Sequence, residues 1–405
     1  MTIDDLLAPA ARRARVPVNE PPAAAITVNF DQGLPDPTLF PIEPLARCLT
    51  DTLAEDADDV LRYYGAGGPA EMQYGHLGLR ERLAAWIARR DGRPRHADDV
   101  LLVNGSTDGL ALAVNTFVGP GDGALVEAAT YPHTRRFMMG TGATVRTVPM
   151  DDDGMVVDEL DDRLAALRDE GLRPKLIYTI PTFHAPTGTV LPLERRLRLL
   201  DIARRWNVIV LEDNCYYEFS YDSAPPPTLL ALDDTGLVVQ SDSFSKYVAP
   251  GLRMAWLASA HETIAALAGS RQDFAVSRVI ARALDRYMAR GELERHLDVL
   301  RARYRTKRDL AVAALREHCQ PWVSFREPAG GFYLWLEIAP TVDWSWVRAE
   351  LAQRGIAVRP GDGMVAEDDP RRFVRLSCIQ VPDDDIAPGI AQIGEVLAAS
   401  ARTSR

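Results

Sequence analysis

A lysine, two serines and an arginine lie within one short segment, SDSFSKYVAPGLR, which covers residues 241–253. Lys246 follows the hydroxyl groups of Ser243 and Ser245, and Arg253 comes seven residues later. A buried ammonium group is costly unless it is paired or used chemically. Hydroxyl and guanidinium groups are suitable donors to a phosphate dianion. A lysine beside a phosphate site indicates a Schiff base to a phosphorylated aldehyde cofactor, pyridoxal 5'-phosphate (PLP).

Composition narrows the choice of lysine, because the chain of 405 residues contains three lysines in all. Lys175 begins an apolar, strand-like run, and Lys307 lies in an arginine-rich helical stretch. Both are expected at ordinary surface positions. Lys246 is therefore the candidate for the covalent bond.

The residues Gly105, Ser106 and Thr107 follow an apolar run and lead into a helical pattern. Free N–H groups at the start of a helix favour a phosphate. Ser106 or Thr107 can also cap the helix with its hydroxyl group. On this pattern alone, a plain helix cap is favoured over a phosphate site.

Further polar side chains follow two other apolar runs. Asp213 and Tyr216 come after Val208–Leu211, and Tyr131 comes after Ala124–Ala129. A carboxylate at a buried strand end needs a cationic partner, and a protonated pyridine nitrogen would be one. Tyr216 would then donate to the ring oxygen and Tyr131 would stack on the ring. The alternatives are that Asp213 caps the next turn and that Tyr131 is an aromatic residue at the rim of a cleft.

Arg375 lies in the middle of the apolar strand pattern Phe373–Ile379. Such a charge needs an anion, and a carboxylate bound through two hydrogen bonds is the best match to a guanidinium. An internal salt bridge is the alternative.

The elements that must position these residues form an α/β pattern. Alternating strands and helices predict a largely parallel sheet that is covered on both faces, and ligands bind at the carboxyl ends of such strands. The seven strand-like runs are Val100–Val103, Ala124–Ala129, Thr144–Val148, Leu176–Ile180, Val208–Leu211, Leu237–Gln240 and Met254–Leu257.

We expect a large domain with a mostly parallel, seven-stranded sheet between helices, and a smaller α+β domain built from the N- and C-terminal segments. Residues 1–55 form an N-terminal arm, extended to about residue 26, and part of the small domain. Residues 56–295 form the large PLP-binding domain and residues 296–405 the small C-terminal domain. A long helical region over residues 275–317 is expected to break at Gly291. The double glycine at 330–331 begins a strand pattern.

Composition excludes several classes of protein. The net charge of −11 disfavours nucleic-acid binding. No apolar run has membrane-spanning length, and the acidic N-terminus lacks a signal pattern. Four scattered cysteines argue against a disulfide framework or a zinc site, so we expect no metal and a cytoplasmic location.

Together these motifs resemble the class I/II aminotransferases, a family of fold type I PLP enzymes, over nearly the whole chain. The segment S-F-S-K-x-x-x-P-G-L-R is similar to the family's lysine motif, and N-G-S-T at 104–107 is similar to its phosphate turn. The resemblance implies an α-amino group transfer between an amino acid and a 2-oxo acid through a Schiff base. It also implies that Lys246 is the general base and acid for the α-proton.

The resemblance also implies substrate and partner contacts. Arg375 would bind the substrate α-carboxylate, and Gly33 would belong to the N-terminal substrate loop. Tyr74 would lie in the loop that reaches the phosphate of the partner subunit. The enzyme is then expected to be a homodimer with shared active sites.

Ala185 is the main departure from the family, which usually has an asparagine here that donates to the ring oxygen. Alanine cannot donate, so the pKa of the Schiff base should rise. One interpretation is a tolerated change, with Tyr216 acting alone. The alternative is a non-transaminating PLP enzyme of specialised metabolism that performs an oxidation, a decarboxylation or a β/γ-replacement or addition.

Two further hypotheses remain open on the sequence. Asp31, just before the substrate loop, would either meet a cationic substrate side chain or lie in a solvated loop, and the second is favoured. The chain also resembles the ligand-binding modules of some bacterial transcription regulators. We expect only a short acidic arm before the catalytic region, which disfavours a DNA-binding domain.

Overall fold

The computed structural model describes residues 3–8, 11, 25–365 and 369–403. Most of the extended arm predicted for residues 1–26 therefore lies outside the described residues. The described part begins with helix α1 (Ile3–Leu6). No described helix combines the length and the apolar character that crossing a membrane requires.

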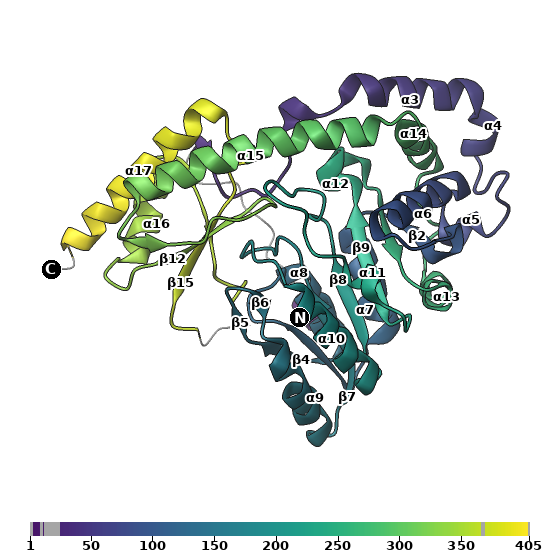
Figure 1. Cartoon of the computed structure of the whole chain (residues 1–405), viewed down its shortest axis with the longest axis horizontal. Coiled ribbons are helices and arrows are strands. Elements are labelled where there is room, and N and C mark those ends of the chain that lie inside the picture. Colours follow the sequence, from purple (N-terminus) through teal and green to yellow (C-terminus); the bar gives the residue numbers. More distant parts are fainter. Residues whose placement is uncertain (1–2, 9–10, 12–24, 366–368, 404–405) are drawn as a thin grey trace.

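A seven-stranded sheet with the order β2–β10–β9–β8–β7–β3–β4 forms the centre of the molecule (Figure 1). Strand β10 is antiparallel to both of its neighbours, and the other pairs are parallel. The predicted mostly parallel sheet is thus confirmed. The strands are β2 (Val100–Val103), β3 (Asp122–Glu127), β4 (Thr144–Val148), β7 (Arg173–Thr179), β8 (Ile209–Asp213), β9 (Val238–Ser243) and β10 (Ala255–Ala258).

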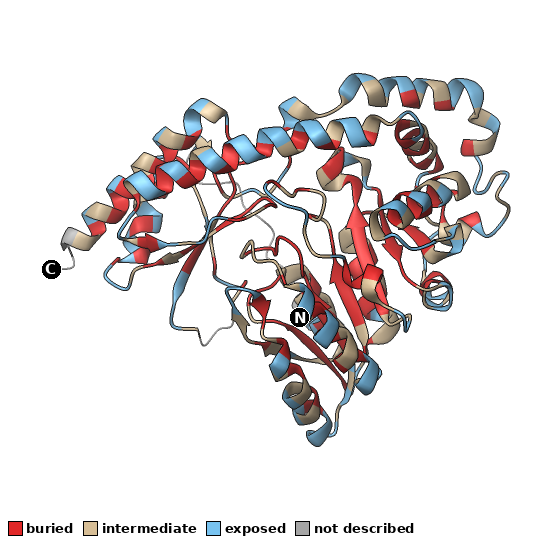
Figure 2. Ribbon diagram, viewed as in Figure 1, coloured by how far each residue is buried: buried red, intermediate tan, exposed pale blue. Residues whose placement is uncertain are grey.

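Helices cover both faces of this sheet. Every residue of β2, β3, β9 and β10 is buried, as the central strands in Figure 2 show, and strands buried on both faces are typical of parallel sheets between helix layers. Helices α7 and α8 pack together, and α9 to α11 form a second neighbouring group. The helices of this region are α6 (Leu77–Asp91), α7 (Ser106–Phe117), α8 (Pro132–Thr141), α9 (Leu160–Asp169), α10 (Leu193–Trp206), α11 (Leu229–Leu232), α12 (Phe244–Tyr247) and α13 (His261–Ser270).

The helical region predicted over residues 275–317 is broken at Gly291, as expected. It forms α14 (Arg278–Ala289) and α15 (Glu292–His318). Gly291 between them has a φ of 68°, a left-handed conformation that glycine adopts without steric cost. Figure 1 shows α15 running along one side of the molecule, from α14 to the C-terminal helix α17 (Asp383–Thr403).

A second, four-stranded antiparallel sheet has the order β11–β12–β15–β14. Strand β1 pairs in parallel with β13, so the N-terminal segment packs on the C-terminal part of the chain, as predicted. The elements of this part are β1 (Val28–Asn29), β11 (Val323–Ser324), β12 (Leu334–Ile338), α16 (Trp344–Gln353), β13 (Ile356–Ala357), β14 (Arg359–Pro360) and β15 (Arg372–Leu376). A small hairpin joins β5 (Met150–Asp151) to β6 (Gly154–Met155).

Strand β12 starts later than the sequence pattern indicates. The predicted strand began at Gly330, but β12 begins at Leu334. Gly331 has a φ of 75°, and its N–H donates to the carbonyl oxygen of Phe219 at 2.9 Å. The double glycine therefore turns the chain before the strand begins.

Two clusters of buried hydrophobic residues lie in the molecule. One surrounds the seven-stranded sheet and the other lies between the small sheet, α16 and α17. Helix α15 contributes Leu293 and Tyr304 to the first cluster and Ala311 and Leu315 to the second. The domain boundaries at residues 55/56 and 295/296 remain predictions.

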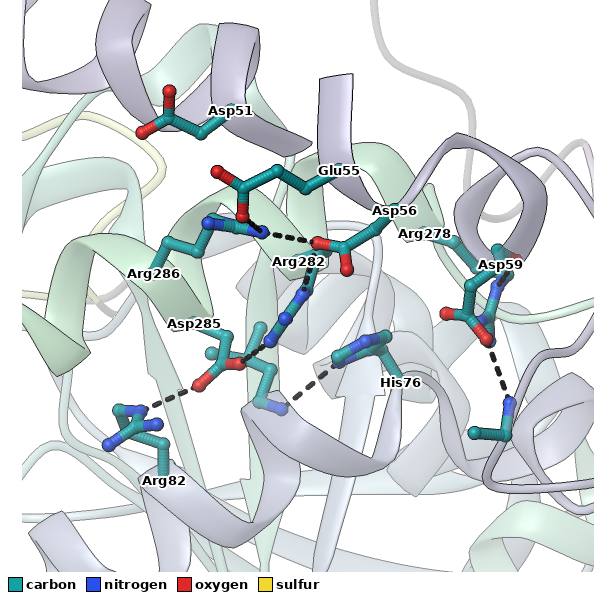
Figure 3. Close-up of polar contacts among 12 residues, drawn as sticks. Asp51, Glu55, Asp56, Asp59, His76, Arg82, Arg278, Arg282, Asp285 and Arg286 are labelled. Carbon is teal, nitrogen blue, oxygen red and sulfur yellow. Dashed lines mark hydrogen bonds and ion pairs between the residues drawn. The ribbon is translucent and has the colours of Figure 1, made fainter. Parts of the chain in front are cut away.

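Charged side chains join the N-terminal helices α3 (Ile42–Glu55) and α4 (Ala57–Val60) to α14 (Figure 3). The Asp56 carboxylate accepts from Arg282 at 2.9 Å and from Arg286 at 2.7 Å. Arg282 also donates to Asp285 at 2.6 Å, and Arg82 of α6 donates to the same carboxylate at 2.6 Å. This network fixes α3 and α6 on opposite sides of α14.

The prediction that Lys307 lies at the surface is wrong. Lys307 is 1% exposed, and its ammonium group lies 3.0 Å from the Asp36 carboxylate and donates to the carbonyl oxygen of Val381 at 2.6 Å. Buried charges of this kind persist when they are paired and hydrogen-bonded. Sequence periodicity alone did not place Lys307 on the buried side of α15. Lys175 is exposed, as predicted.

Candidate active site

A cavity of about 310 Å³ lies at the carboxyl ends of strands β2, β3, β7 and β8. It brings together most of the residues that the sequence marked for chemistry. The predicted site residues that line it are Gly33, Ser106, Thr107, Tyr131, Asp213, Tyr216, Ser245, Lys246, Arg253 and Arg375. Three predicted residues, Gly105, Ser243 and Tyr74, are not among the lining residues.

Lys246 lies in the short helix α12, which directly follows β9. Its ammonium nitrogen donates to the carbonyl oxygen of Gly33 at 2.7 Å. The same nitrogen lies 5.9 Å from the centre of the Tyr216 ring and 5.7 Å from that of Phe332. The lysine is thus held by a neutral carbonyl group among aromatic rings.

Asp213 ends strand β8 and is 4% exposed. The Tyr178 hydroxyl donates to its Oδ2 at 2.9 Å, whereas Oδ1 has no hydrogen-bond partner among the described residues. Burial raises the pKa of Asp213, and the Tyr178 hydrogen bond offsets part of this rise. A buried carboxylate oxygen without a partner is ready to accept a hydrogen bond from a cation such as a protonated ring nitrogen.

The expectation that Ser106 or Thr107 caps α7 is wrong. Gly105 occupies the N-cap position with a φ of 95°, and no side chain caps this helix end. Ser106 is instead the first helical residue, so its hydroxyl lines the cavity. The first N–H groups of a helix without a side-chain cap remain free for an anion.

Arg253 lies against the same turn. Its Nη2 donates to the carbonyl oxygen of Asn104 at 3.0 Å, and its Nη1 donates to that of Pro250 at 3.3 Å. A Cβ atom on Gly105 would lie 2.0 Å from Arg253 Nη2. Gly105 is therefore needed for the close approach of the guanidinium, although it does not line the cavity itself.

Ser243 contacts the site indirectly, through Ser245. Its hydroxyl donates to Ser245 Oγ at 2.9 Å and accepts from the Ser245 N–H at 3.0 Å. Ser243 thus caps α12 and orients Ser245, whose side chain lines the cavity. Of the two serines, only Ser245 is placed to contact a phosphate.

Arg375 in β15 reaches the cavity from the small sheet. Its Nη2 donates to the main-chain oxygen of Asp31 at 2.8 Å, and its buried Nε has no partner among the described residues. The Asp31 carboxylate is paired with Arg359 and lies 4.0 Å from Arg375. The cation that Asp31 meets is therefore an arginine of its own chain.

Sequence reasoning did not find Tyr333, Cys215 and Met364, which also line the cavity. The Tyr333 hydroxyl lies 2.9 Å from the Tyr216 hydroxyl, and the Arg375 guanidinium lies 4.4 Å from the centre of the Tyr333 ring. A polar hydroxyl within the apolar run after the double glycine was the available signal for Tyr333. Met364 enters through a turn, where its carbonyl oxygen accepts from the Thr130 N–H at 2.9 Å.

A buried pair holds the loop that carries Ala185. Glu127 lies 3.0 Å from His184 Nε2 and accepts from the Thr179 hydroxyl at 2.7 Å. The Ile180 N–H donates to the same carboxylate at 3.1 Å. Glu127 thus fixes the end of β7 and places Ala185 in the cavity wall.

Tyr74 lies in α5 (Glu71–Tyr74), away from this cavity. The Arg80 guanidinium is 5.2 Å from the centre of its ring. The expected contact of Tyr74 with the phosphate of a partner subunit stays a prediction.

Comparisons with known proteins agree with this geometry. The family model described as aminotransferase class I and II matches residues 71–393. Aromatic-amino-acid aminotransferase 1 of Thermococcus litoralis is 32% identical over 375 residues, which cover 91% of this chain and 88% of that protein.

Two solved structures are similar over their whole length. The multiple substrate aminotransferase of Thermococcus profundus has a TM-score of 0.89 at 27% identity and covers 100% of both chains. The α-aminoadipate aminotransferase of Thermus thermophilus, complexed with N-(5'-phosphopyridoxyl)-L-leucine, has a TM-score of 0.88 at 26% identity and also covers 100% of both chains. These matches do not favour the non-transaminating alternative. The chain belongs to the class I and II aminotransferases, and it is a PLP-dependent enzyme that transfers an amino group between an amino acid and a 2-oxo acid.

Proposed function

We propose that the cavity around Lys246 is the PLP site of this aminotransferase. The residues present fit the cofactor at both of its ends. The partnerless Oδ1 of Asp213 suits a protonated ring nitrogen. At the opposite end, the uncapped start of α7 suits a phosphate together with Ser106, Thr107, Ser245 and Arg253.

Each side chain then has a definite task. PLP, when bound, supplies an electron sink for the substrate carbon. Lys246 would hold the cofactor aldehyde covalently, and its amine is placed to take and return the α-proton of the substrate. Asp213 would keep the ring nitrogen protonated, and Tyr216 would donate to the ring oxygen. Tyr131 would stack on the ring.

Arg375 is the proposed binding residue for the substrate α-carboxylate. Its Nη2 is already bound to a main-chain oxygen, and its Nε is buried without a partner among the described residues. A guanidinium in this state can donate to a carboxylate through two N–H groups. Gly33, whose carbonyl holds Lys246, forms the wall of the substrate site next to it.

The charges of the cavity bear on the substrate class. Its lining cations are Lys246, Arg253 and Arg375, and each already has a partner in the cofactor or in the α-carboxylate. Within one chain, no lining cation among the described residues is then left for an acidic side chain, while Ile180 and Met364 offer apolar surface. We infer that the amino donor has a neutral, apolar or aromatic side chain.

A substrate panel tests this inference. We expect kcat/KM for phenylalanine or leucine to exceed that for 2-aminoadipate or aspartate by at least about tenfold, because a buried acidic side chain without a partner is costly. Equal or higher kcat/KM for the acidic donors would contradict the inference. The names of the relatives do not set this order, because the protein from Thermococcus litoralis is named for aromatic amino acids and that from Thermus thermophilus for α-aminoadipate.

The role of Lys246 is tested separately. Lys246→Ala should lose the visible absorbance band of the Schiff base and all turnover. The matched control is Lys175→Ala, which removes an exposed lysine and should keep both. A Lys246→Ala protein that retains the absorbance band would refute the assignment of the site.

We also propose a homodimer with shared active sites, in the cytoplasm, without nucleic-acid or membrane partners. The net charge of −11 supports the lack of a nucleic-acid partner. The scattered cysteines support a reducing compartment. We also propose a large domain of residues 56–295 and a small domain built from residues 1–55 and 296–405. The two separate hydrophobic clusters support two domains, whereas Cys48 and Leu297 of the first cluster lie outside residues 56–295.

A further inference from the structure

Two tyrosine hydroxyls meet inside the cavity. The hydroxyl oxygens of Tyr216 and Tyr333 are 2.9 Å apart, and the two residues are 5% and 7% exposed. Their rings lie edge to face, with centres 5.6 Å apart and planes at 75°. Tyr216 follows β8 and Tyr333 precedes β12, so the pair links the large sheet to the small one.

The position of the Tyr333 hydroxyl is fixed by its neighbours. The Arg375 guanidinium lies over its ring at 4.4 Å. A Cβ atom on Gly33 would lie 2.1 Å from the Tyr333 hydroxyl oxygen. The phenol thus occupies space that glycine leaves open, next to the carbonyl group that binds Lys246.

Ala185 lines the same cavity and offers no side-chain donor. A phenol has one proton to donate and can accept through its oxygen. If Tyr216 donated to Tyr333, its proton would not be available for a hydrogen bond to the cofactor. If Tyr333 donates to Tyr216, the Tyr216 proton stays free for the ring oxygen, and the hydrogen bond from Tyr333 polarises Tyr216 into a stronger donor.

We propose that Tyr333 is a positioning residue that acts through Tyr216 and restores the donor strength that Ala185 lacks. Because Ala185 donates no hydrogen bond, the negative charge on the ring oxygen of PLP would be stabilised by Tyr216, which in turn accepts a hydrogen bond from Tyr333. The inference rests on the proposed contact of Tyr216 with that oxygen.

The surroundings of the pair keep Tyr216 protonated, and either hydroxyl can be the donor at this distance. Burial keeps the pKa of Tyr216 well above its ordinary value, so Tyr216 stays protonated as a donor. The titratable groups that surround the pair are Lys246 from α12, Arg375 from β15, Tyr131 before α8, and Asp213 and Cys215 beside Tyr216. The Tyr333→Phe change removes none of these groups.

The test is a pH titration of the visible absorbance of the PLP-loaded enzyme. Tyr333→Phe removes one hydroxyl and keeps the ring. Because the negative ring oxygen loses support, the pKa of the bound cofactor should rise by about half a unit to one unit, the size expected for one hydrogen bond. The matched control is Tyr287→Phe, a buried phenol without a hydrogen-bond partner among the described residues, which should leave this pKa unchanged.

A rescue variant separates this role from mere packing. Ala185→Asn supplies a direct donor, so it should lower the raised pKa of Tyr333→Phe towards the native value. In the native background, where Tyr333 already acts, the same change should lower the pKa by less. An unchanged pKa in Tyr333→Phe, or an equal effect of Ala185→Asn in both backgrounds, would overturn the proposal.

Failure of the wider assignment has a different signature. If the site were misassigned, Lys246→Ala would keep the absorbance band, whatever Tyr333→Phe does. If only the role of Tyr333 were wrong, Lys246→Ala would lose the band and Tyr333→Phe would titrate like the native enzyme.

Discussion

At the scale of single residues, the two oxygens of Asp213 have unequal surroundings. One accepts from Tyr178, and the other has no partner among the described residues. A buried carboxylate in this state is unstable as an anion, and its pKa is raised. A protonated ring nitrogen would supply both the missing hydrogen bond and the opposite charge. The carboxylate is therefore suited to a cation that arrives with the cofactor.

Asp213→Asn keeps the size of the side chain and removes its charge. We expect kcat to fall by about 10²- to 10³-fold, the range seen when one preorganised electrostatic contact is lost. Steady-state kinetics with saturating PLP would measure this. Asp161→Asn, which breaks a surface pair with Arg205, is the control and should keep kcat. A fall of less than threefold in Asp213→Asn would contradict the assigned role.

Alanine substitutions at Gly105 and Gly121 distinguish the effect of a steric contact from that of backbone strain. Gly105→Ala places a methyl group 2.0 Å from Arg253 Nη2 at a φ of 95°, so Arg253 must move away from the proposed phosphate position. We expect the Kd for PLP to rise at least about tenfold, since a charge-assisted hydrogen bond is lost. Gly121→Ala is a matched control, because its φ is 81° but open space surrounds the added methyl group. Fluorescence titration of both apoenzymes should show the rise for Gly105→Ala alone.

At the scale of elements, helix α15 holds the loop that carries Gly33 in place. Asp36, three residues after Gly33, pairs with Lys307 of α15 at 3.0 Å, and its main-chain N–H donates to the Tyr304 hydroxyl of the same helix at 3.2 Å. Side-chain exposures of 2% for Lys307 and 8% for Asp36 mark the pair as buried. The loop that carries Gly33 to Lys246 therefore depends on a helix far away in sequence.

Lys307→Ala leaves the buried Asp36 carboxylate without its cation. We expect the free energy of unfolding to fall by about 3–5 kcal/mol, as for other broken buried pairs, measured by urea denaturation at neutral pH. Lys175→Ala, at an exposed position, should stay within about 0.5 kcal/mol of the native protein. An equal loss of unfolding free energy in both variants would show that the Asp36–Lys307 pair does not stabilise the protein more than an exposed lysine does.

The same pair has a defined pH dependence. Burial alone would raise the pKa of Asp36, but hydrogen bonds from Thr38 and Lys307 bring the net pKa below its ordinary value. The stability from the pair is then fully present above the ordinary aspartate pKa and is lost as the pH falls through the lowered pKa. The difference in unfolding free energy between the native protein and Lys307→Ala should therefore shrink in acid. A difference that grows in acid would contradict this linkage.

The sequence predicted the elements better than the contacts between them. Strands β2 and β4 have their predicted bounds, because short apolar runs between turns are a local signal. On its own pattern, the turn favoured Ser106 or Thr107 as a helix cap, but Gly105, with its positive φ, occupies the N-cap position. Lys307 and Tyr333 were not identified, since their partners Asp36 and Tyr216 are more than a hundred residues away and no periodicity reveals such pairs.

At the scale of the whole molecule, the site is assembled from distant parts of the chain. Lys246 from the large sheet binds the carbonyl oxygen of Gly33, and Arg375 from the small sheet binds that of Asp31. One N-terminal loop thus engages both functional cations. The small sheet must be docked on the large one before Arg375 can reach the cavity that holds Lys246, so formation of the substrate site is coupled to the packing of both hydrophobic clusters.

The ion pairs between α14 and the N-terminal helices bear on the proposed homodimer. Arg278 of α14 pairs with Asp59 at 2.7 Å (Figure 3). Arg278 also pairs with the buried Glu71 of α5. Helix α5 carries Tyr74, the residue proposed to reach the phosphate of a second subunit. A well-anchored α5 can present Tyr74 to a partner with little entropic cost. The homodimer proposal thus predicts that each active site draws on both chains.

Subunit mixing tests this prediction. Lys246→Ala removes the covalent lysine, and Tyr74→Phe removes a hydroxyl group that would act in the other subunit, so at limiting PLP each homodimer should be nearly inactive. A hybrid dimer carries both defects in one site and none in the other. Equal co-expression makes half of the dimers hybrid, and activity should recover to roughly one quarter of the native value. Light scattering should give about twice the chain mass of 44.7 kDa, and a mixture no more active than its separate components would show that Tyr74 does not serve a partner's site.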